Sequence, residues 1–418
     1  MKVIYRRCAG LDVHEKSVFV CARILRGKQL EIIEATFPTF TEDLEALRDW
    51  LVRHRIQRVA MESTGVYWRP VWNVLEQGKL DLILLNPYHV KALPGHKTDR
   101  VDAARIAELA QYDLVRASFV PPPEIRELRD LMRRRVHLVE DRNRVSNRIH
   151  RLLELQNIKL SSVLGKMTGA TARSILEGLA TAQTMKPEAL ALLATHKRVR
   201  AKREQLAKAL RCRPTEHFRF LLRELLEELD RLTGKIAMLE ARISERMLPH
   251  QEVIDRLCQI PGVERITAWT LIAEIGLDMG RFPDSGHLAS WCGLCPGNAK
   301  SAGKRYSGRT NKGNKYVRRV LVQSAWAAAR IVRRRNFFTT LFYRISRRAG
   351  MKKAAVAVAH RLLTIVYSMI RTGTEYCEQG ADYFDRLHPL RTLNRLTARI
   401  DNLRSWLQTA PKYSPQTT

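Results

Sequence analysis

The chain has 418 residues, of which 45% are hydrophobic, so it is long enough for two or three globular domains and is not a disordered chain. It carries 73 Lys and Arg against 42 Asp and Glu, which gives a formal net charge of +31. This excess predicts a polyanionic partner. We expect nucleic acid rather than a membrane surface, because we recognise neither a lipidation signal nor a basic amphipathic helix.

The cysteines and the apolar segments indicate the compartment. The seven cysteines are odd in number and scattered, which is typical of a reducing cytosol rather than of a disulfide framework. The first residues lack the apolar core of a signal peptide, and no uncharged apolar run is long enough to span a membrane. We therefore expect a cytoplasmic protein with no membrane partner.

The N-terminal part alternates strands and helices. Residues 5–33 predict a β-hairpin with its turn at 26–28, and Thr41 is a suitable N-cap for the helix that follows. Short buried strands are predicted at 58–62 and 80–85, with a helix between them. This alternation predicts an α/β domain with a mixed sheet, in which ligands bind at strand ends.

Four carboxylates fall at such positions, namely Asp12, Glu62, Asp99 and Asp102. The last two lie at the start of a predicted helix and project from one face of it, so they repel each other unless a cation lies between them. Each acid alone has an ordinary explanation as a helix cap or a solvated strand end. Four of them in a basic protein favour a Mg²⁺ site, whose chemistry is phosphodiester cleavage or transfer.

The middle of the chain is predicted to be helical. Three prolines at 121–123 mark a first domain boundary, and beyond it apolar residues recur at helical spacing. Between Phe218 and Ile243 these residues alternate in steps of four and three, which is a heptad seam with charged flanks. Such a seam joins either two helices of one chain or two subunits, and we favour dimerisation.

A helix–glycine turn–helix pattern at 260–276 is followed by a long basic stretch. Residues 285–374 contain no Asp or Glu, and a run of one sign predicts a surface for a phosphate backbone. The expected nucleic-acid-binding residues are Lys300, Lys304, Arg305, Arg309, Lys312, Lys315, Arg318 and Arg319.

Residues 300–309 combine small residues with cations, which lets a backbone approach a phosphate and favours a nucleophilic oxygen. Ser301, Tyr306 and Ser307 are the candidate nucleophiles, and the spacing does not choose among them. Cys292 and Cys295 form a lone C-x-x-C motif, which is too little for a structural zinc site because two more ligands are needed.

Several ordered motifs in this chain resemble those of one known family. The N-terminal segments are GLDVH at 10–14, MESTGVYW at 61–68 and KTDRVDA at 97–103. The C-terminal segments are PGV at 261–263, FP at 282–283, LASWCGL at 288–294, KSAGK at 300–304, KGN at 312–314 and RR at 318–319. Together they resemble the IS110 family of insertion-sequence transposases, with its IS1111 branch. Two departures are that only one glycine follows Ala302, and that Cys292 replaces a small residue.

The resemblance implies a fold class and a domain order. We expect an α/β RuvC-like, RNase H-type domain at 1–122 and a helical coiled-coil segment at 123–246. A mostly α-helical transposase domain is expected at 247–375, and a C-terminal tail at 376–418.

The resemblance also implies roles for single residues. It assigns the Mg²⁺-binding carboxylates to Asp12, Glu62, Asp99 and Asp102, and the nucleophile to Ser301, which would form a covalent phosphoserine link to DNA. The two parts are implied to meet in one composite site across subunits of a homo-oligomer, a dimer that becomes a tetramer when active. A structured non-coding bridge RNA is implied to pair with target and donor DNA, and the basic excess suits both partners.

Two alternatives differ in kind from this DNA recombinase. A RuvC-like junction nuclease would use metal-activated water and would form no covalent intermediate. A nucleic-acid-binding scaffold with an inactive site would not be an enzyme at all, and the complete set of four carboxylates argues against it.

Overall fold

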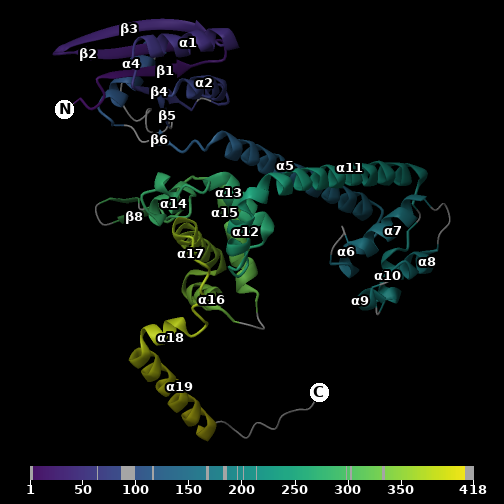
Figure 1. Cartoon of the computed structure of the whole chain (residues 1–418). Helices are drawn as coiled ribbons and strands as arrows, with labels where there is room; N and C mark the ends of the chain where they lie inside the picture. Colours follow the sequence, from purple (N-terminus) through teal and green to yellow (C-terminus); the bar gives the residue numbers. More distant parts are fainter. Residues whose placement is uncertain are drawn as a thin grey trace. The chain divides into compact units, whose positions relative to one another are not determined.

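The computed structural model of the protein describes residues 3–63, 65–85, 99–114, 117–165, 169–181, 186–194, 196–200, 202–212, 214–297, 299–301, 304–331 and 335–409. The chain divides into two compact units, Met1–Pro121 and Pro122–Thr418. Figure 1 draws both units with their helices and strands labelled.

The N-terminal unit is built on one mixed sheet. Its strands are β1 (Arg7–Val13), β2 (Ser17–Arg26), β3 (Gln29–Pro38), β4 (Arg58–Glu62), β5 (Asp81–Leu85) and β6 (Ala117–Ser118). They lie in the order β3-β2-β1-β4-β5-β6. The first three strands are antiparallel neighbours, β4 and β5 run parallel to β1, and β6 pairs antiparallel with β5.

Helices cover both faces of this sheet. Helices α1 (Thr41–Arg53) and α2 (Trp68–Leu75), with the 3-10 turn η1 (Glu76–Gly78), pack their leucines on Leu11, Val59 and other apolar side chains of one face. Helix α4 (Asp99–Gln111) packs on the other face, where Ile106 and Ala110 meet Ala60. A three-stranded antiparallel meander joined to two parallel strands is the RNase H-type arrangement, and the predicted fold class of this part is confirmed.

The structure differs from the prediction near the N-terminus. Residues 5–33 were predicted to form one hairpin, but the segment from Arg7 contains two strands before the turn at Gly27. The backbone N–H of His14 donates to the carbonyl oxygen of Ser17 at 2.9 Å, which closes a tight turn between β1 and β2. Because polar residues at 14–16 are too few to read as a loop, the two strands look like one in the sequence.

The C-terminal unit is predominantly helical, as predicted. Its first elements are α5 (Pro123–Leu155), α6 (Leu160–Val163), α7 (Ala170–Thr181), α8 (Pro187–Leu192), α9 (Lys197–Arg200), α10 (Arg203–Ala209), α11 (Glu216–Met247) and η2 (Leu248–His250). They are followed by α12 (Gln251–Cys258), α13 (Arg265–Ile275), η3 (Met279–Arg281), α14 (Ser285–Trp291), β7 (Ala299–Ser301), β8 (Lys304–Ser307), α15 (Lys315–Ala329), α16 (Phe337–Ala349), α17 (Met351–Thr372), α18 (Tyr383–Leu387) and α19 (Pro389–Thr409).

The heptad seam predicted between Phe218 and Ile243 lies on α11 and is used inside the chain. Leu222, Leu229 and Ile236 share one buried cluster with Leu138 and Val145 of α5. Figure 1 shows α5 and α11 as two long helices side by side. The structure therefore favours the intramolecular alternative for this seam over the predicted dimer contact. The homo-oligomer itself stays a prediction.

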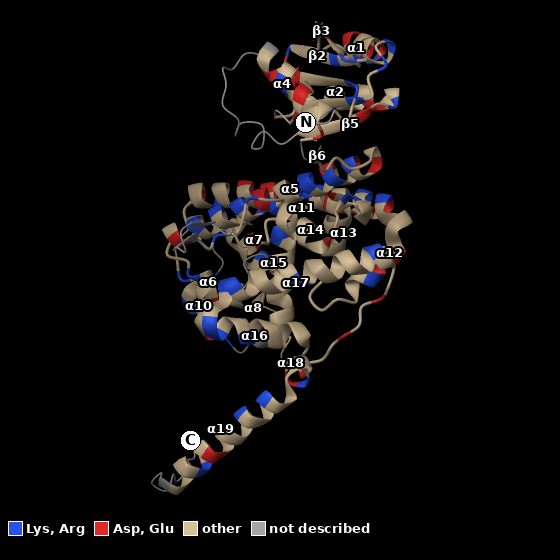
Figure 2. Cartoon of the chain, turned by 90° about the vertical axis from the view of Figure 1, so that its left-hand side faces the viewer, with Lys and Arg blue, Asp and Glu red and all other residues tan. Residues whose placement is uncertain are grey.

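Two helices of this unit have features that the sequence analysis missed. Helix α19 is a basic amphipathic helix with exposed apolar residues such as Leu393, Ile400 and Leu407, and Figure 2 shows its arginines in blue along an otherwise mostly tan helix. Helix α17 is long and apolar enough to cross a membrane by length and composition alone. Half of its most apolar window is buried inside the unit, which is typical of a core helix of a globular protein.

Candidate functional site

Two of the predicted carboxylates lie on neighbouring parallel strands. Leu11 of β1 is opposite Met61 of β4, so Asp12 and Glu62 follow this pair at the carboxyl ends of their strands. Side chains alternate between the two faces of a sheet. Asp12 therefore shares a face with Gly10, and Glu62 shares a face with Ala60, which contacts α4. Both acids are on the α4 face.

Helix α4 brings its first turn toward these strand ends. A Cβ atom on Gly10 would lie only 2.2 Å from the carbonyl oxygen of Ala103, and the Cys8 thiol donates to the carbonyl oxygen of Ala107 at 3.3 Å. Moving along β1 from Cys8 toward Asp12 thus means moving toward the N-terminus of α4. Only glycine permits this close approach of helix and strand.

The other two predicted carboxylates occupy the start of α4. Asp99 is the first residue of the helix, and Asp102 is half-buried one turn later, on the stripe that continues through Ile106. The side chain of Asp99 lies outside the described part. The fold places the backbones of all four residues at one end of the sheet.

Asp12 has a sheltered environment. It is 7% exposed, and its Oδ2 lies 3.0 Å from Nε2 of His14, which is two residues further along the chain. A pocket of about 500 Å³ beside it is lined by Val13, His14, Glu15, Lys16, Gly65 and Tyr67. Sequence reasoning missed His14 as a member of the site, although an i, i+2 spacing is the signal for side chains on one face.

The donor set suits a hard divalent cation, because carboxylate oxygens are the ligands that Mg²⁺ prefers. Among the described side chains, no group of three His, Cys, Asp or Glu residues is close enough to hold a metal ion. Asp99 is not among those side chains.

The predicted nucleophile stands at the end of a two-stranded hairpin. Ser301 is the last residue of β7 and pairs with Lys304 of β8, next to the turn. Ser307 ends β8 at the base of the hairpin, opposite Ala299. The side chains of residues 298–307 lie outside the described part, so the backbone alone separates the two serines. One is at the tip and the other is at the base.

The base of this hairpin is held by several backbone contacts. Pro296 and Thr310 form an isolated bridge, and the N–H of Gly297 donates to the carbonyl oxygen of Arg309 at 2.7 Å. A Cβ atom on Gly313 would lie 2.2 Å from the nitrogen of Gly293, so the chain returns in direct backbone contact with the end of α14. Backbone contacts therefore fix the base of the hairpin.

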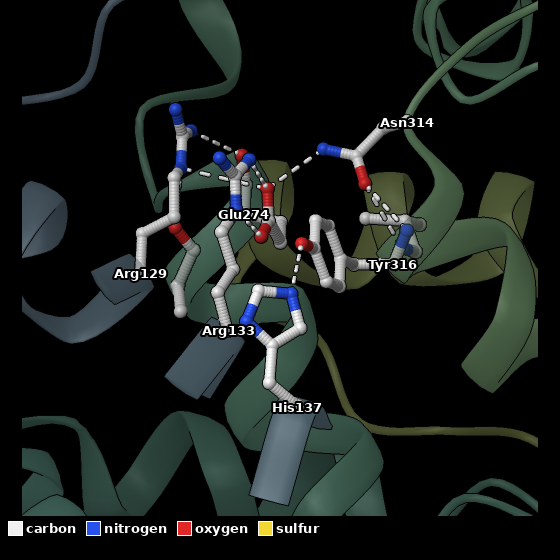
Figure 3. A network of polar contacts seen from close by, with 8 residues as sticks. Arg129, Arg133, His137, Glu274, Asn314 and Tyr316 are labelled. Atoms are coloured by element: carbon white, nitrogen blue, oxygen red, sulfur yellow. Dashed lines mark hydrogen bonds and ion pairs between the residues drawn. The ribbon is translucent and has the colours of Figure 1, made fainter. Parts of the chain in front are cut away.

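The segment that follows the hairpin is joined to α5 and α13 by a buried carboxylate, Glu274. Figure 3 shows Glu274 at the centre of a polar network. Glu274 is fully buried. Arg133 of α5 donates from Nε and Nη2 to its two oxygens at 2.8 Å each, and Asn314 donates from Nδ2 to Oε2 at 2.7 Å. Arg129 adds hydrogen bonds from Nε to the carbonyl oxygen of Ala273 at 3.2 Å and from Nη2 to that of Glu274 at 2.6 Å.

The same network fixes the start of α15. Oδ1 of Asn314 accepts hydrogen bonds from the backbone N–H groups of Tyr316 and Val317 at 3.0 and 3.1 Å, which caps the helix. Burial opposes the charge of Arg133, but its hydrogen bonds and its attraction to Glu274 outweigh that effect and raise its pKa. Sequence analysis missed Glu274, although a lone acid in an otherwise apolar helix indicates a buried partner.

The predicted basic residues differ in their surroundings. The side chains of Arg309, Lys312 and Lys315 are exposed, and Arg318 is half-buried. Arg319 pairs with Glu140 of α5 at 2.6 Å. The side chains of Lys300, Lys304 and Arg305 lie outside the described part. The described cations thus follow the chain from the hairpin base into α15.

The C-x-x-C motif has a packing role in the structure. Cys292 is fully buried, and burial is the main cause that raises the pKa of its thiol. The thiol of Cys295 approaches the carbonyl oxygen of Gly286 at 3.9 Å.

Comparisons with known proteins identify two matching segments in the chain. Residues 9–158 match the transposase family DEDD_Tnp_IS110, and residues 254–338 match the Transposase IS116/IS110/IS902 family. The transposase for insertion sequence element IS1111A of Coxiella burnetii is 28% identical over 70% of this chain and 72% of its own length. A probable family 20 transposase of Pseudomonas aeruginosa is 27% identical over 88% of this chain and 94% of its own length.

A solved structure of RuvC from Thermus thermophilus is similar over 27% of this chain and 99% of its own length, with 14% identity and a TM-score of 0.22. The two matched family segments together cover more than half of the chain and include both the strand-end carboxylates and the serine hairpin. The chain belongs to the IS110 family of transposases, enzymes that cleave and join DNA.

Proposed function

We propose that this transposase moves its own insertion sequence by a serine-based recombination reaction. The observation that carries the proposal is the convergence of Asp12, Glu62 and the first turn of α4 at one end of the sheet. This arrangement supplies carboxylate oxygens in a protein whose net charge of +31 suits a nucleic-acid substrate.

In the proposed reaction the hydroxyl oxygen of Ser301 attacks a phosphorus atom of the DNA backbone. A bond forms between the serine oxygen and phosphorus, and the bond from phosphorus to one deoxyribose oxygen breaks. The serine proton leaves and the released sugar oxygen is protonated. Rejoining reverses these changes when a hydroxyl of the new partner strand attacks the phosphoserine, so no external energy source is needed.

Asp12, Glu62, Asp99 and Asp102 are proposed to hold Mg²⁺. The bound ion would supply positive charge that polarises the phosphate and stabilises the leaving oxygen. The role of the chain is to keep these oxygens in a sheltered place. His14 orients the Asp12 carboxylate through the contact at 3.0 Å.

The proposal also names the nucleic-acid and protein partners of the enzyme. We propose that a structured non-coding RNA guides the enzyme to donor and target DNA in the cytoplasm, and that a homo-oligomer carries out the exchange. The basic residues from Arg309 to Arg319 provide charge that suits phosphates of either nucleic acid.

The test is covalent trapping. Purified protein, Mg²⁺, the RNA of its element and a labelled junction DNA are separated on a denaturing gel. We expect a protein–DNA adduct with the wild type that is absent from Ser301→Ala. Ser307→Ala and Tyr306→Phe are matched controls in the same hairpin, and both should keep the adduct.

Two outcomes would contradict the serine mechanism. Cleaved DNA without an adduct in any lane would instead support the nuclease that uses water. An adduct that persists in Ser301→Ala and disappears in Ser307→Ala or Tyr306→Phe would move the nucleophile to that residue.

A further inference from the structure

The C-terminal unit contains a groove that the proposed chemistry does not use. It measures about 1120 Å³ and lies between the loop at 308–310 and the first half of α17. The bridge pair Pro296 and Thr310, which forms the base of the serine hairpin, lines one part of it. The groove is therefore next to the segment that carries Ser301.

The charged lining of the groove is entirely cationic. Arg309 and Arg318 come from the loop and α15, and Lys352 and Lys353 come from the first turn of α17. Among the described residues no Asp or Glu lines it, and the sequence of residues 285–374 contains none. Four cations around one groove repel one another, so the arrangement favours an anionic ligand with several charges.

The remaining lining is mostly apolar. Leu294, Pro296, Val356 and Ala357 form apolar surface between the cations. His360 also lines the groove, and burial, with a smaller effect of Arg361, lowers its pKa, so it is a neutral donor and acceptor at pH 7. Apolar surface beside cations suits a ligand that has both phosphates and flat uncharged faces.

The size and shape of the groove favour an extended ligand. Small-molecule pockets usually enclose about 300–1,000 Å³ and bury most of their ligand. This groove is larger and runs along a helix. A duplex hides its base faces in the stack, whereas an unpaired strand presents phosphates, sugars and bases together.

We infer that this groove binds an unpaired nucleic-acid strand. Lys352, Lys353, Arg309 and Arg318 contact successive phosphates, and the surface around Ala357 contacts sugars and bases. The inference rests on the proposed function only in taking nucleic acid as the partner. The strand is DNA or RNA, since both share the phosphodiester backbone.

The test measures binding by fluorescence anisotropy with the full chain in the Ser301→Ala background and a chelator, so that catalysis does not contribute. The probes are a labelled single-stranded DNA of about 12 nucleotides, the RNA of the same sequence and the matching duplex. Each titration is repeated between roughly 50 and 200 mM salt.

The double variant Lys352→Gln/Lys353→Gln removes two charges from the groove. Arg347→Gln/Arg348→Gln is its matched control, because it removes two exposed charges from the neighbouring α16, outside the groove lining. We expect the groove variant to weaken single-strand binding about tenfold and to reduce the slope of log K against log salt by about 1.4, with a smaller change in the control.

Ala357→Trp separates shape from charge, since it fills the groove and removes no cation. It should weaken single-strand binding while the salt slope stays unchanged. A tighter complex with DNA or with RNA identifies the strand that occupies the groove. Equal losses in the groove variant and its control, or a larger loss for duplex than for single strand, would overturn the inference. Normal single-strand binding by the groove variant would also overturn the inference, and it would leave the serine mechanism intact.

Discussion

Asp12 and Glu274 are both buried carboxylates in a strongly basic protein, yet their surroundings differ. Glu274 accepts hydrogen bonds on both oxygens from Arg133 of α5 and on one from Asn314, and it has no exposed surface. Asp12 lies at the end of β1, beside His14 and next to an open pocket. Glu274 therefore lies inside a polar network of the protein, whereas Asp12 lies beside a pocket that is open to solvent.

This difference separates an anchor from a candidate ligand. A carboxylate whose two oxygens accept hydrogen bonds from guanidinium and amide donors has its charge already compensated, so it has little to offer an added cation. It joins α13, α5 and the start of α15 instead. A carboxylate at a strand end beside a pocket is a candidate ligand for a cation that enters the pocket. Burial alone does not distinguish the two, whereas the chemistry of the neighbours does.

The largest expected effect is on catalysis. Asp12→Asn removes the charge and retains the shape, so strand cleavage should fall about 10³-fold or more, because a metal ion contributes several kcal/mol to such transition states. The free energy of unfolding should change little. The measurements are a cleavage assay on junction DNA and a urea titration.

Glu15→Gln is the matched control for this change. Glu15 is an exposed acid that lines the same pocket, and the substitution removes the same charge. Cleavage should stay within a few-fold of wild type. Similar losses in both variants would mean that the general potential of the pocket, and not Asp12, supports the reaction.

The second effect is on stability. Glu274→Ala removes a fully buried carboxylate from Arg129 and Arg133, whose side chains are 14% and 36% exposed. The loss of one partner of a buried ion pair lowers stability by up to about 3–5 kcal/mol, and the partial exposure of Arg133 places the expected loss at the lower end of that range. Thermal unfolding of the full chain should show its first transition at a clearly lower temperature.

Glu240→Ala serves as the comparison, because Glu240 pairs with Arg135 of the same helix α5 but is 36% exposed. Partly exposed pairs contribute about 0–1 kcal/mol. If the two variants were destabilised equally, the burial of Glu274 would not increase the contribution of its ion pair to stability.

The sequence allowed part of the sheet end to be predicted but not the Glu274 network. Short apolar runs predicted the buried strand that ends at Glu62, whereas Asp12 lay inside a segment that was predicted as a single strand. Arg133 and Glu274 are 141 positions apart, and Asn314 is a further 40 away. No periodic pattern connects residues on three helices, since their contact depends on how those helices pack.

The seam of α11 shows the same limit in another form. Its four-three spacing correctly predicted a long helix with a partner. It could not show which helix covers it, because the apolar face looks the same for α5 of one chain and for a second copy. The packing partner of a helix depends on the whole fold, whereas the local spacing of apolar residues determines only which face of the helix is apolar.

The smallest effect concerns Asn314, which contacts Glu274 and also caps α15. Asn314→Ala loses the cap and one hydrogen bond, so stability should fall by about 1–2 kcal/mol. Asn314→Asp keeps the cap acceptor but sets a second carboxylate against Glu274 at a position where the two polar atoms are 2.7 Å apart. If the cap is the main role of Asn314, the aspartate variant is as stable as wild type. If the contact with Glu274 dominates, it is less stable than the alanine variant.

We expect the second result, with a pH dependence of defined sign. The neighbouring Glu274 raises the pKa of the introduced carboxyl in the folded state above its unfolded value. The folded protein then binds more protons, so the aspartate variant loses stability as the pH rises through this interval and recovers it as the pH falls. Urea titrations of both variants at pH 5 and pH 8, both above the unfolded pKa of about 3.9, would measure this loss of stability. A deficit that is the same at both pH values would show that the two carboxyl groups do not interact.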